Sequence, residues 1–524
     1  MQHAETADPP HTNPLQGGLT QAPPPTPCRV SKTGGRKWPA SSVLRTCLLA
    51  ASLSLCSSSL SPLTAQGPAR SSTQPTRPIC SLTPGESDSL LIIGTLIDEQ
   101  PAPGTSALLL AKGRVVATGA PQAIAPKPTP TTYDCGSSYI SPGFINPHEH
   151  LHLSGGFPDY RLEPVYSHRD EWRGKAPSEH PELSYRRSPK PIHRFWIELR
   201  HLLAGTTTLA SAQGVRGLAK NAGPGPRAAG YTYRLDMETF PYGLAATKTF
   251  GDGSCKEPAN VPEPKNNSAL VHRPYVPHVA EGTNCVAELE GKAYLDYVSR
   301  NPGRRYSLIH GLGLNQSDGR RLEELDVTLI WSPRSNLALY GQTAPIPTLR
   351  DAGVRVAIST DWSHSGSFNM LEEIRCADQV DSQRWDDRLS GRDYWLMATA
   401  HAAYALGLED KTGKLEPGLA GDVVVLRNNT DDPFRDLLRA TVDDVIATFV
   451  DGELASGHYD GFDRRMLPEQ CRNDLGDRHF VCADYTKLQR DYGFGHDKLV
   501  RANAGTVPLF NADRQAPCEV TSAP

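Results

Sequence analysis

Short apolar runs alternate with helix-like stretches through the middle of the chain. The runs that we predict to be buried strands lie at 206–211, 306–312, 327–333 and 354–360. Stretches with apolar residues at helical spacing accompany them, as in FWIELRHLLAG (195–205) and TAPIPTLRDAG (343–353). Such alternation is typical of βα units on a parallel sheet. We therefore predict an α/β fold whose main part, residues 141–410, is a (β/α)8 TIM-like barrel.

Two further groups of β-like runs flank this region. The first group covers 90–98 and 106–119, and the second covers 413–426 and 443–454. Lys112-Gly113 and Asp451-Gly452 are predicted to be hairpin turns, because each lies between two β-rich runs. We expect both ends of the core chain to meet in a small discontinuous β-sandwich formed by residues 84–140 and 411–456. Residues 457–524 follow as a C-terminal extension.

The first 83 residues differ in composition from the rest. They are rich in Pro, Ser, Thr and Gln and poor in large apolar side chains, which predicts a leader without a packed core. Basic residues precede the apolar run CLLAASLSLC (47–56), and small residues follow it up to Ala65. This pattern is that of a secretory signal, and the run is too short to span a bilayer. We expect a secreted or periplasmic protein, with a lipid anchor on Cys56 as the alternative.

Cysteine usage favours the same compartment. Eight of the 11 cysteines follow the apolar run of the leader, and none has CxxC spacing. They are Cys80, Cys135, Cys255, Cys285, Cys376, Cys471, Cys482 and Cys518. An even number without that spacing favours disulfides over a zinc-thiolate site, and we expect Cys255 to pair with Cys285. Scattered buried thiols in a cytosolic enzyme are the alternative.

The charge balance argues against a nucleic-acid partner. The chain has 54 basic and 58 acidic side chains and a formal net charge of -4, so its field is too weak to favour nucleic acid or an anionic membrane. Its 524 residues, 38% of them hydrophobic, suffice for ordinary cores. We expect a small-molecule substrate, and the sequence leaves open whether the chain forms a homo-oligomer.

The segment SPGFINPHEHLH (141–152) places three histidines in five residues behind an apolar run. Alternate residues of an extended strand point to the same face, so His148 and His150 can reach one metal ion. His150 and His152 can do so equally well. Periodicity alone therefore leaves the register of the ligands open.

Other polar residues follow the remaining predicted strands. In a barrel all of these positions lie at the C-terminal strand ends and face one mouth. The full set is His148, His150, His278, Glu281, His310 and Asp361. Nitrogen donors with one carboxylate suit a divalent transition metal, zinc first and iron second, rather than calcium or magnesium.

The order of these motifs resembles the amidohydrolase superfamily, in particular the branch of cytosine and guanine deaminases and triazine chlorohydrolases. SPGFINPHEH resembles the first-strand metal motif, and AGTTTLAS, HVAE, SPRSN and STDWSHSGSFNMLEEIR resemble the second, fifth, seventh and eighth strands. The resemblance extends from about Leu90 to Leu454. It implies that His148, His150, His278 and Asp361 hold the metal, which leaves His152 as a neighbour.

The same resemblance implies the roles of the other groups. Asp361 would take a proton from a metal-activated water, and His310 would orient that water or polarise the substrate. Glu281 would pass protons to a substrate nitrogen and to the leaving group. These roles describe a deaminase or amidohydrolase that cleaves a carbon–nitrogen bond of a small, cyclic substrate. Arg334 and Asn336 are expected to brace the seventh strand rather than touch the substrate. Trp331 is expected to have a packing role.

Two other interpretations stay open. Lys248 lies where binuclear members of the superfamily carry a carboxylated lysine, and His278 and His310 would then bind a second metal in a peptidase or lactonase. Alternatively, the chain is a catalytically inactive scaffold. The spacing from His278 to Glu281 favours the mononuclear deaminase.

Two polar segments depart from the family pattern. Residues 154–193 follow the first strand, and residues 221–274 are rich in Gly, Pro and Asn. We expect both to overhang the barrel mouth and to set specificity.

Overall fold

The computed structural model describes residues 78–97, 106–157, 166–176, 178–185, 187, 190–211, 214–215, 218–223, 274–476, 478–510 and 518. The predicted signal segment lies outside these residues, as do Lys248, Cys255 and most of the segment 221–274.

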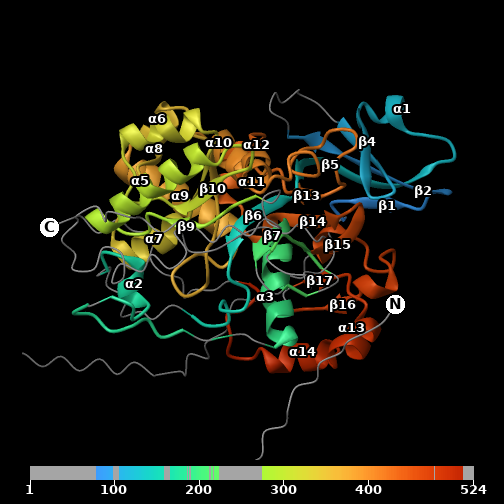
Figure 1. Ribbon diagram of the computed structural model, residues 1–524. Coiled ribbons are helices and arrows are strands. Elements are labelled where there is room, and N and C mark those ends of the chain that lie inside the picture. Colours follow the sequence, from blue (N-terminus) through green and yellow to red (C-terminus); the bar gives the residue numbers. More distant parts are fainter. Residues whose placement is uncertain are drawn as a thin grey trace, which may run out of the picture. The chain divides into compact units, whose positions relative to one another are not determined.

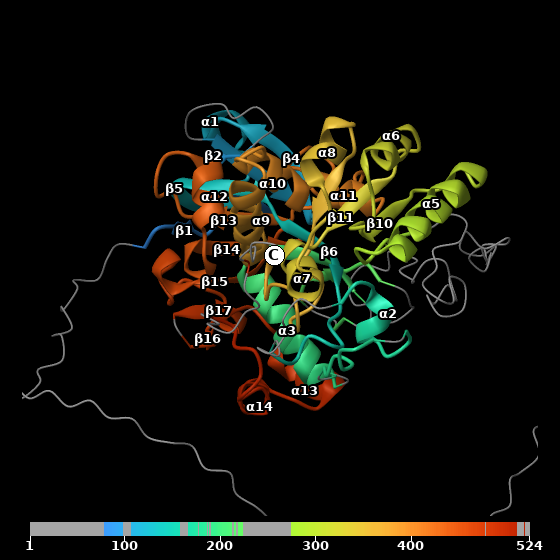
Figure 2. The ribbon, with the colours of Figure 1, turned by 90° about the vertical axis from the view of Figure 1, so that its left-hand side faces the viewer.

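Parallel strands form an arc that carries the polar residues of interest (Figures 1 and 2). They are β6 (Phe144–Glu149), β7 (Thr206–Ser211), β8 (Lys220–Asn221), β9 (His278–Val279), β10 (Ser307–His310), β11 (Thr328–Trp331) and β12 (Val356–Ile358). One sheet has the order β6-β7-β8 and the other has the order β12-β11-β10-β9, with parallel pairing in each. An isolated parallel bridge between Glu149 and Asp361 connects the two sheets. Residues 224–273 separate β8 from β9 in sequence and lie outside the described part, so closure into a barrel stays a prediction.

Helices pack on this arc, as the alternating pattern predicts. The major ones are α3 (Pro191–Leu203), α5 (Cys285–Arg300), α6 (Gln316–Glu324), α7 (Pro333–Tyr340), α8 (Ile346–Asp351), α9 (Met370–Arg384), α10 (Gly391–Ala398) and α11 (Ala400–Ala405). Helix α3 contacts β7, and α11 contacts β6, β11 and β12. The strands are buried along their whole length except at His278, and most of their apolar side chains fill two core clusters shared with the helices.

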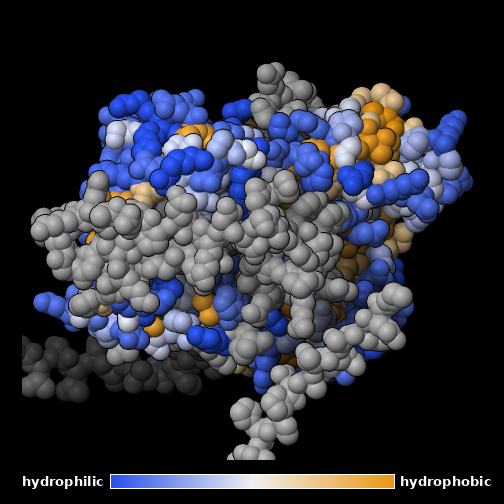
Figure 3. Space-filling model, in the orientation of Figure 1, coloured by the Kyte–Doolittle hydropathy of each residue, from blue (hydrophilic) through white to orange (hydrophobic). Residues whose placement is uncertain are grey.

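Local sequence signals begin the helices. The Asn284 side chain accepts a hydrogen bond from the backbone N–H of Ala287 at the start of α5, 3.2 Å away. Asn315 and Asp318 form a reciprocal capping box at the start of α6. The exposed surface over α6 and α8 is largely hydrophilic (Figure 3), as expected for helices with one buried face.

Both ends of the core chain join one mixed sheet. Its strands are β1 (Ser81–Thr83), β2 (Ser87–Leu96), β3 (Ser106–Ala111), β4 (Arg114–Gly119), β5 (Pro130–Pro142), β13 (Val423–Leu426), β14 (Val445–Val450), β15 (Glu453–His458), β16 (Asn473–Asp474) and β17 (His479–Val481). The two ends meet where β5 pairs antiparallel with β13, with Ile140 opposite Val425 (Figure 1). Lys112-Gly113 and Asp451-Gly452 form the predicted turns, since all four residues have φ between 50° and 75°.

The sheet reaches beyond the segments predicted for it. Ser81–Thr83 fall within the predicted leader, yet they form β1 on β5, which corrects the expectation that residues up to 83 lack packed structure. A disulfide between Cys80 and Cys135 holds this short strand in place. At the other end, β15 crosses the predicted boundary at 456/457, and β17 pairs with β15.

The described residues also form other helices and 3-10 turns. They are α1 (Pro121–Ile124), α2 (Arg169–Trp172), α12 (Pro433–Arg439), α13 (Tyr485–Tyr492), α14 (His496–Ala502) and the 3-10 turns Val442–Asp444, Tyr459–Gly461 and Glu469–Cys471. Helices α13 and α14 share an apolar cluster with α3 through Leu488, Leu499 and Phe195. In the described part of the chain, no helix has the length and apolar character needed to cross a membrane.

Disulfides occur as the cysteine count predicts. Besides Cys80–Cys135, the structure contains Cys376–Cys518 and Cys471–Cys482. Cys285 is also disulfide-bonded. Its expected partner Cys255 lies outside the described residues, so that pairing stays a prediction.

Candidate metal and catalytic site

The C-terminal ends of strands β6, β9 and β10 bring four histidines together. The ring of His148 lies 4.6 Å from that of His150 and 4.7 Å from that of His278, measured between centroids. The His278 and His310 rings are 5.5 Å apart. Potential ligand atoms of His148, His150 and His278 all lie within 4.8 Å of one another, as do those of His148, His310 and Asp361. The histidines therefore surround one point, as the strand-end argument predicts.

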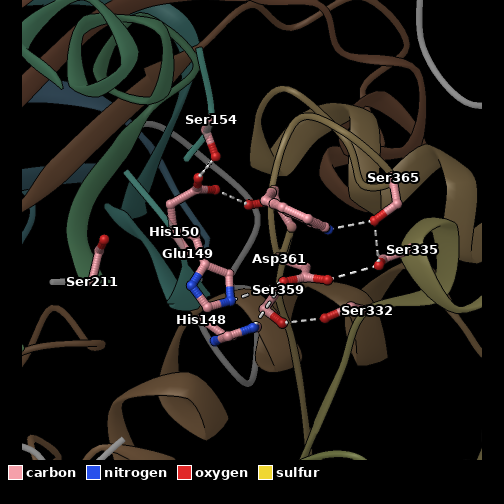
Figure 4. Close-up of polar contacts among 12 residues, drawn as sticks. His148, Glu149, His150, Ser154, Ser211, Ser332, Ser335, Ser359, Asp361 and Ser365 are labelled. Atoms are coloured by element: carbon pink, nitrogen blue, oxygen red, sulfur yellow. Dashed lines mark hydrogen bonds and ion pairs between the residues drawn. The ribbon is translucent and has the colours of Figure 1, made fainter. Parts of the chain in front are cut away.

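Asp361 contacts this cluster through one carboxylate oxygen. Its Oδ1 lies 2.9 Å from Nε2 of His148 and 3.3 Å from Nε2 of His150. Ser335 donates a hydrogen bond to Oδ2 at 2.7 Å (Figure 4). The backbone of Asp361 is in the left-handed region, with φ of 65°, which non-glycine residues adopt mainly where the surroundings hold them. Oδ1 of Asp361 therefore contacts the two histidines, while Oδ2 is held by the hydroxyl of Ser335.

The donor set fits a divalent transition metal. Burial lowers the pKa of His148 to about 4 and lowers that of His278 well below its usual range, so both imidazoles are neutral near pH 7. A neutral imidazole offers a nitrogen lone pair, the form that binds zinc. Within the described residues, Nδ1 of each of these histidines is buried without a hydrogen-bond partner. Three imidazoles and a carboxylate match the ligand types of a catalytic zinc site.

His310 and Glu281 lie beside the proposed ligands. Nδ1 of His310 is 3.1 Å from the amide oxygen of Asn336. Because an amide oxygen only accepts, Nδ1 carries the proton. The other nitrogen, Nε2, is 3.7 Å from Oε2 of Glu281. His310 has φ of 77°, a second left-handed residue at a strand end. A carboxylate and an imidazole thus stand within reach of each other next to the metal ligands.

A cavity of about 520 Å3 opens onto these groups. Its lining includes His150, His278, Glu281, His310 and Asp361. Aromatic side chains form part of the wall, since Trp172, Tyr185 and Trp362 also line it. The ring centroids of Tyr185 and Trp362 are 5.3 Å apart, and those of Trp172 and Trp362 are 5.6 Å apart. The cavity is large enough for a small substrate.

The segment predicted to overhang the mouth does line the cavity. Trp172, Arg173, Lys175, Leu183 and Tyr185 all come from the described part of residues 154–193. The second segment, 221–274, lies almost wholly outside the described residues.

Most predicted site residues meet at this one place. His148, His150, His278, Glu281, His310 and Asp361 cluster as described, whereas His152 belongs to neither group of potential ligands found among the site residues. Asn336, which lies on α7, does more than brace the neighbouring strand, since its amide oxygen binds His310. Arg334 binds Ser367 through Nε at 2.6 Å and is absent from the cavity lining, and Trp331 is fully buried. Lys248 lies outside the described residues, so the structure gives no geometry for the two-metal alternative.

Sequence reasoning missed the residues that support the site. Glu149 lies between two proposed ligands and accepts hydrogen bonds from Ser154 and from Thr360, the latter at 2.6 Å (Figure 4). Nε2 of His201 lies 3.2 Å from Oε2 of Glu149. The one signal in the sequence is that successive side chains of a strand face opposite sides, so Glu149 is expected to face away from His148 and His150. Tyr340, which binds Glu281, follows no strand and had no signal in the sequence.

Comparisons with known proteins agree with this arrangement. The Amidohydrolase family model matches residues 278–455. A 5-methylthioadenosine/S-adenosylhomocysteine deaminase of Syntrophomonas wolfei is 29% identical over 172 residues, which are 31% of this chain and 40% of that protein. The enzyme of the same name from Desulforudis audaxviator is 38% identical over 123 residues, 23% of this chain and 29% of that protein.

A solved structure shares the fold over a longer range. An adenosine deaminase from Xanthomonas campestris with bound zinc aligns with 79% of this chain and 98% of its own, with a TM-score of 0.50 and 18% identity. Residues 278–455 of this chain are therefore an amidohydrolase-type domain. Only a minority of the length of its relatives in sequence is matched, 40% and 29% in the two deaminases above. The matched residues include His278, Glu281, His310 and Asp361, while substrate and activity need an argument from the site itself.

Proposed function

We propose that this protein is a metal-dependent hydrolase that removes an amino group from a small cyclic substrate. The observation that carries the proposal is that three imidazoles meet Asp361 beside a cavity, which Glu281 and His310 also line. We also infer that the parallel arc closes as a (β/α)8 barrel, because the strand ends that bear these groups then face a single mouth.

His148, His150, His278 and Asp361 would hold the metal. Zinc is the first candidate, since three imidazole nitrogens and one carboxylate oxygen are donors that it favours, and iron is the second. A divalent metal in this position lowers the pKa of water and so supplies a nucleophile near neutral pH. The zinc in the structurally similar adenosine deaminase is consistent with this choice.

The side chains of this chain would move the protons of a hydrolytic deamination. Asp361 takes a proton from water as the water oxygen bonds to the ring carbon that carries the amino group. The electron pair of the adjacent carbon–nitrogen double bond moves to the ring nitrogen, which takes a proton from Glu281. Glu281 then takes the proton of the new hydroxyl group and passes it to the amino nitrogen, so that a carbonyl forms and the carbon–nitrogen bond breaks with its electron pair on the leaving ammonia. Return of the proton held by Asp361 to Glu281 restores both residues, so substrate and water give the oxo product and ammonia.

Purines carrying a 6-amino group are the first substrates to try. The relatives are deaminases of 5-methylthioadenosine, S-adenosylhomocysteine and, in Methanothermobacter thermautotrophicus, 5'-deoxyadenosine, the last 30% identical over 169 residues. The aromatic wall of the cavity suits a flat ring. His310, placed by Asn336, would orient water or polarise the ring.

Metal analysis and an ammonia assay test the proposal together. Purified protein is expected to contain one equivalent of zinc or iron per chain, and to release ammonia from at least one of 5-methylthioadenosine, S-adenosylhomocysteine, 5'-deoxyadenosine, adenosine, guanine and cytosine. Two equivalents of metal with lactonase or peptidase activity would instead support the binuclear alternative through Lys248. Absence of bound metal and of any turnover would favour the inactive scaffold.

We further propose that the protein is secreted or periplasmic. The leader pattern motivates this proposal, and the disulfides Cys80–Cys135, Cys376–Cys518 and Cys471–Cys482 support it, because such bonds persist mainly in oxidising compartments.

A further inference from the structure

A tyrosine binds the carboxylate proposed to shuttle protons. The hydroxyl of Tyr340, on α7, donates a hydrogen bond to Oε1 of Glu281 at 2.8 Å. The indole N–H of Trp172, on α2, donates to the same hydroxyl at 2.8 Å. Tyr340 and Glu281 are both buried, whereas Trp172 is only partly buried and lines the cavity. A relay of two hydrogen bonds therefore runs from the cavity wall to Glu281.

The direction of this relay is set by its first member. An indole N–H can only donate, so the Tyr340 oxygen accepts the hydrogen bond from Trp172. The hydroxyl proton of Tyr340 is then the one donated to Glu281. Burial and then the charge of Glu281 raise the pKa of Tyr340 well above its usual value, which keeps the hydroxyl protonated. Oε1 of Glu281 is thereby anchored, and Oε2 is the oxygen near His310, 3.7 Å from its Nε2. One oxygen is fixed and the other is left to exchange a proton.

The segment that carries Trp172 also grips the backbone beside Glu281. The amide of Arg169 donates to the carbonyl of Glu281 at 3.1 Å, and the amide of Thr283 donates to the carbonyl of Ser167 at 2.9 Å. His168 and Gly282 form an isolated antiparallel bridge. The segment that follows β6 thus holds Glu281 through the Glu281 main chain as well as through the Glu281 carboxylate.

A buried ion pair reinforces this attachment. The guanidinium of Arg169 binds the carboxylate of Glu290 through both terminal nitrogens, with the Nη1 contact at 2.6 Å. Both side chains are almost completely buried. Oε2 of Glu290 also accepts from the amide of Ala280 at 2.8 Å. Because a buried pair is costly to break, α2 stays against the residues on either side of Glu281.

We propose that Tyr340 is a positioning residue for Glu281 and that α2 completes the relay through Trp172. This inference rests on the proposed function, since it assigns Glu281 the proton transfer. Helix α2 therefore both lines the cavity through Trp172 and, through Tyr340, orients the carboxylate of Glu281. A ring that packs against Trp172 binds next to a Glu281 that is already oriented.

Two single substitutions with matched controls test the relay. Tyr340→Phe removes the hydroxyl, and Trp172→Phe removes the indole N–H but keeps an aromatic wall. Tyr394→Phe and Trp196→Phe are the controls, because their donors bind the carbonyls of Ala377 and Val507 and neither residue lines the cavity. Activity is measured as ammonia release from the compound in the proposed panel that the wild type converts fastest.

Tyr340→Phe is expected to lower kcat about 10-fold or more, the scale of a lost hydrogen bond to a charged group, with KM changed by less than about twofold. Trp172→Phe is expected to lower kcat by a smaller factor, and any KM change reflects its place in the wall. Metal content should match the wild type in all four variants, and both controls should keep full activity. Unchanged kcat in Tyr340→Phe would overturn the inference.

The decisive measurement repeats these substitutions in other backgrounds. If Tyr340 acts through Glu281, Tyr340→Phe changes kcat less than about twofold in Glu281→Gln, and Trp172→Phe loses its kcat effect in Tyr340→Phe. A general structural role instead gives the same factor in every background and overturns the positioning role. A wild type that releases no ammonia from any compound defeats the proposed function, whereas an active wild type without this coupling defeats only the relay.

Discussion

Asp361 pairs with His148 through both side chain and backbone, although 213 positions separate them in sequence. Their side chains meet at 2.9 Å between Oδ1 and Nε2, and the amide of Asp361 donates to the carbonyl of His148 at 3.1 Å. The carbonyl of Asp361 in turn accepts from the amide of His150 at 3.0 Å. Strand β6 and the residues just after β12 are therefore hydrogen-bonded to each other at the residues that would hold the metal.

Removal of either partner should empty the site. We expect His148→Ala and Asp361→Ala to abolish both bound metal and turnover, because each loses a ligand and the bond between the two strand ends. Metal per chain, measured by mass spectrometry of purified protein alongside the ammonia assay, checks this. His152→Ala is the matched control, and it should keep its metal, since His152 lies outside both groups of potential ligands found among the site residues. Full activity in metal-free protein would contradict the prediction.

Glu281 and Lys248 distinguish one metal from two. Glu281→Gln should keep its metal while turnover falls by roughly 10²-fold or more, the scale of general acid–base catalysis, and Lys248→Ala should change little. In a binuclear enzyme the ranking reverses, because a carboxylated Lys248 would bridge two like-charged ions. Metal content and kcat of the two variants decide the matter. Halved metal in Lys248→Ala with a nearly silent Glu281→Gln would replace the deaminase by the peptidase or lactonase.

The sequence predicted those features that repeat along the chain. Strands β7, β10, β11 and β12 lie within the runs predicted to be buried strands. Strands β10, β11 and β12 are mostly apolar, as is typical of strands buried on both faces. The turns at Lys112-Gly113 and Asp451-Gly452 followed from a glycine-containing pair between two β-rich runs. The metal cluster followed from the rule that parallel strands end at one edge.

Contacts between distant segments could not be predicted in this way. Tyr340 meets Glu281 and Trp172 only because α2 folds back onto α7, and no period or spacing in the sequence encodes that approach. Strand β1 was missed because three residues with one apolar side chain carry no strand signal, and the Cys80–Cys135 disulfide holds them in place. Such features depend on tertiary packing rather than on local preference.

Export can be tested on the protein from its native host. The mature chain is expected to begin after about Ala65, as N-terminal sequencing would establish. Alkylation without reduction should label no cysteine after that point, and peptide mapping should recover Cys255 linked to Cys285 in addition to the three disulfides that the structure shows. An uncleaved leader together with eight alkylated thiols would contradict both expectations.

Glu198 gives stability a dependence on pH that is independent of the metal site. This glutamate lies on α3 and is fully buried. Burial raises its pKa to about 8, although the amide of Val215 donates to Oε2 at 3.1 Å. Between pH 4.5 and 8 the folded chain therefore keeps a proton that the unfolded chain has released. The folded state binds more protons, so the free energy of unfolding falls as pH rises through this window.

Glu198→Gln should remove this part of the pH dependence, because the amide stays neutral at every pH. Relative to the wild type, the variant should gain stability steadily from pH 5 to pH 8 and show no further gain above about pH 8. Each unit of pKa shift corresponds to about 1.4 kcal/mol, so the gain is easily measured by denaturant unfolding. Glu324→Gln, an exposed change on α6, serves as the control and should follow the wild-type profile. An unchanged difference between Glu198→Gln and wild type across that range would show that Glu198 is ionised in the folded protein.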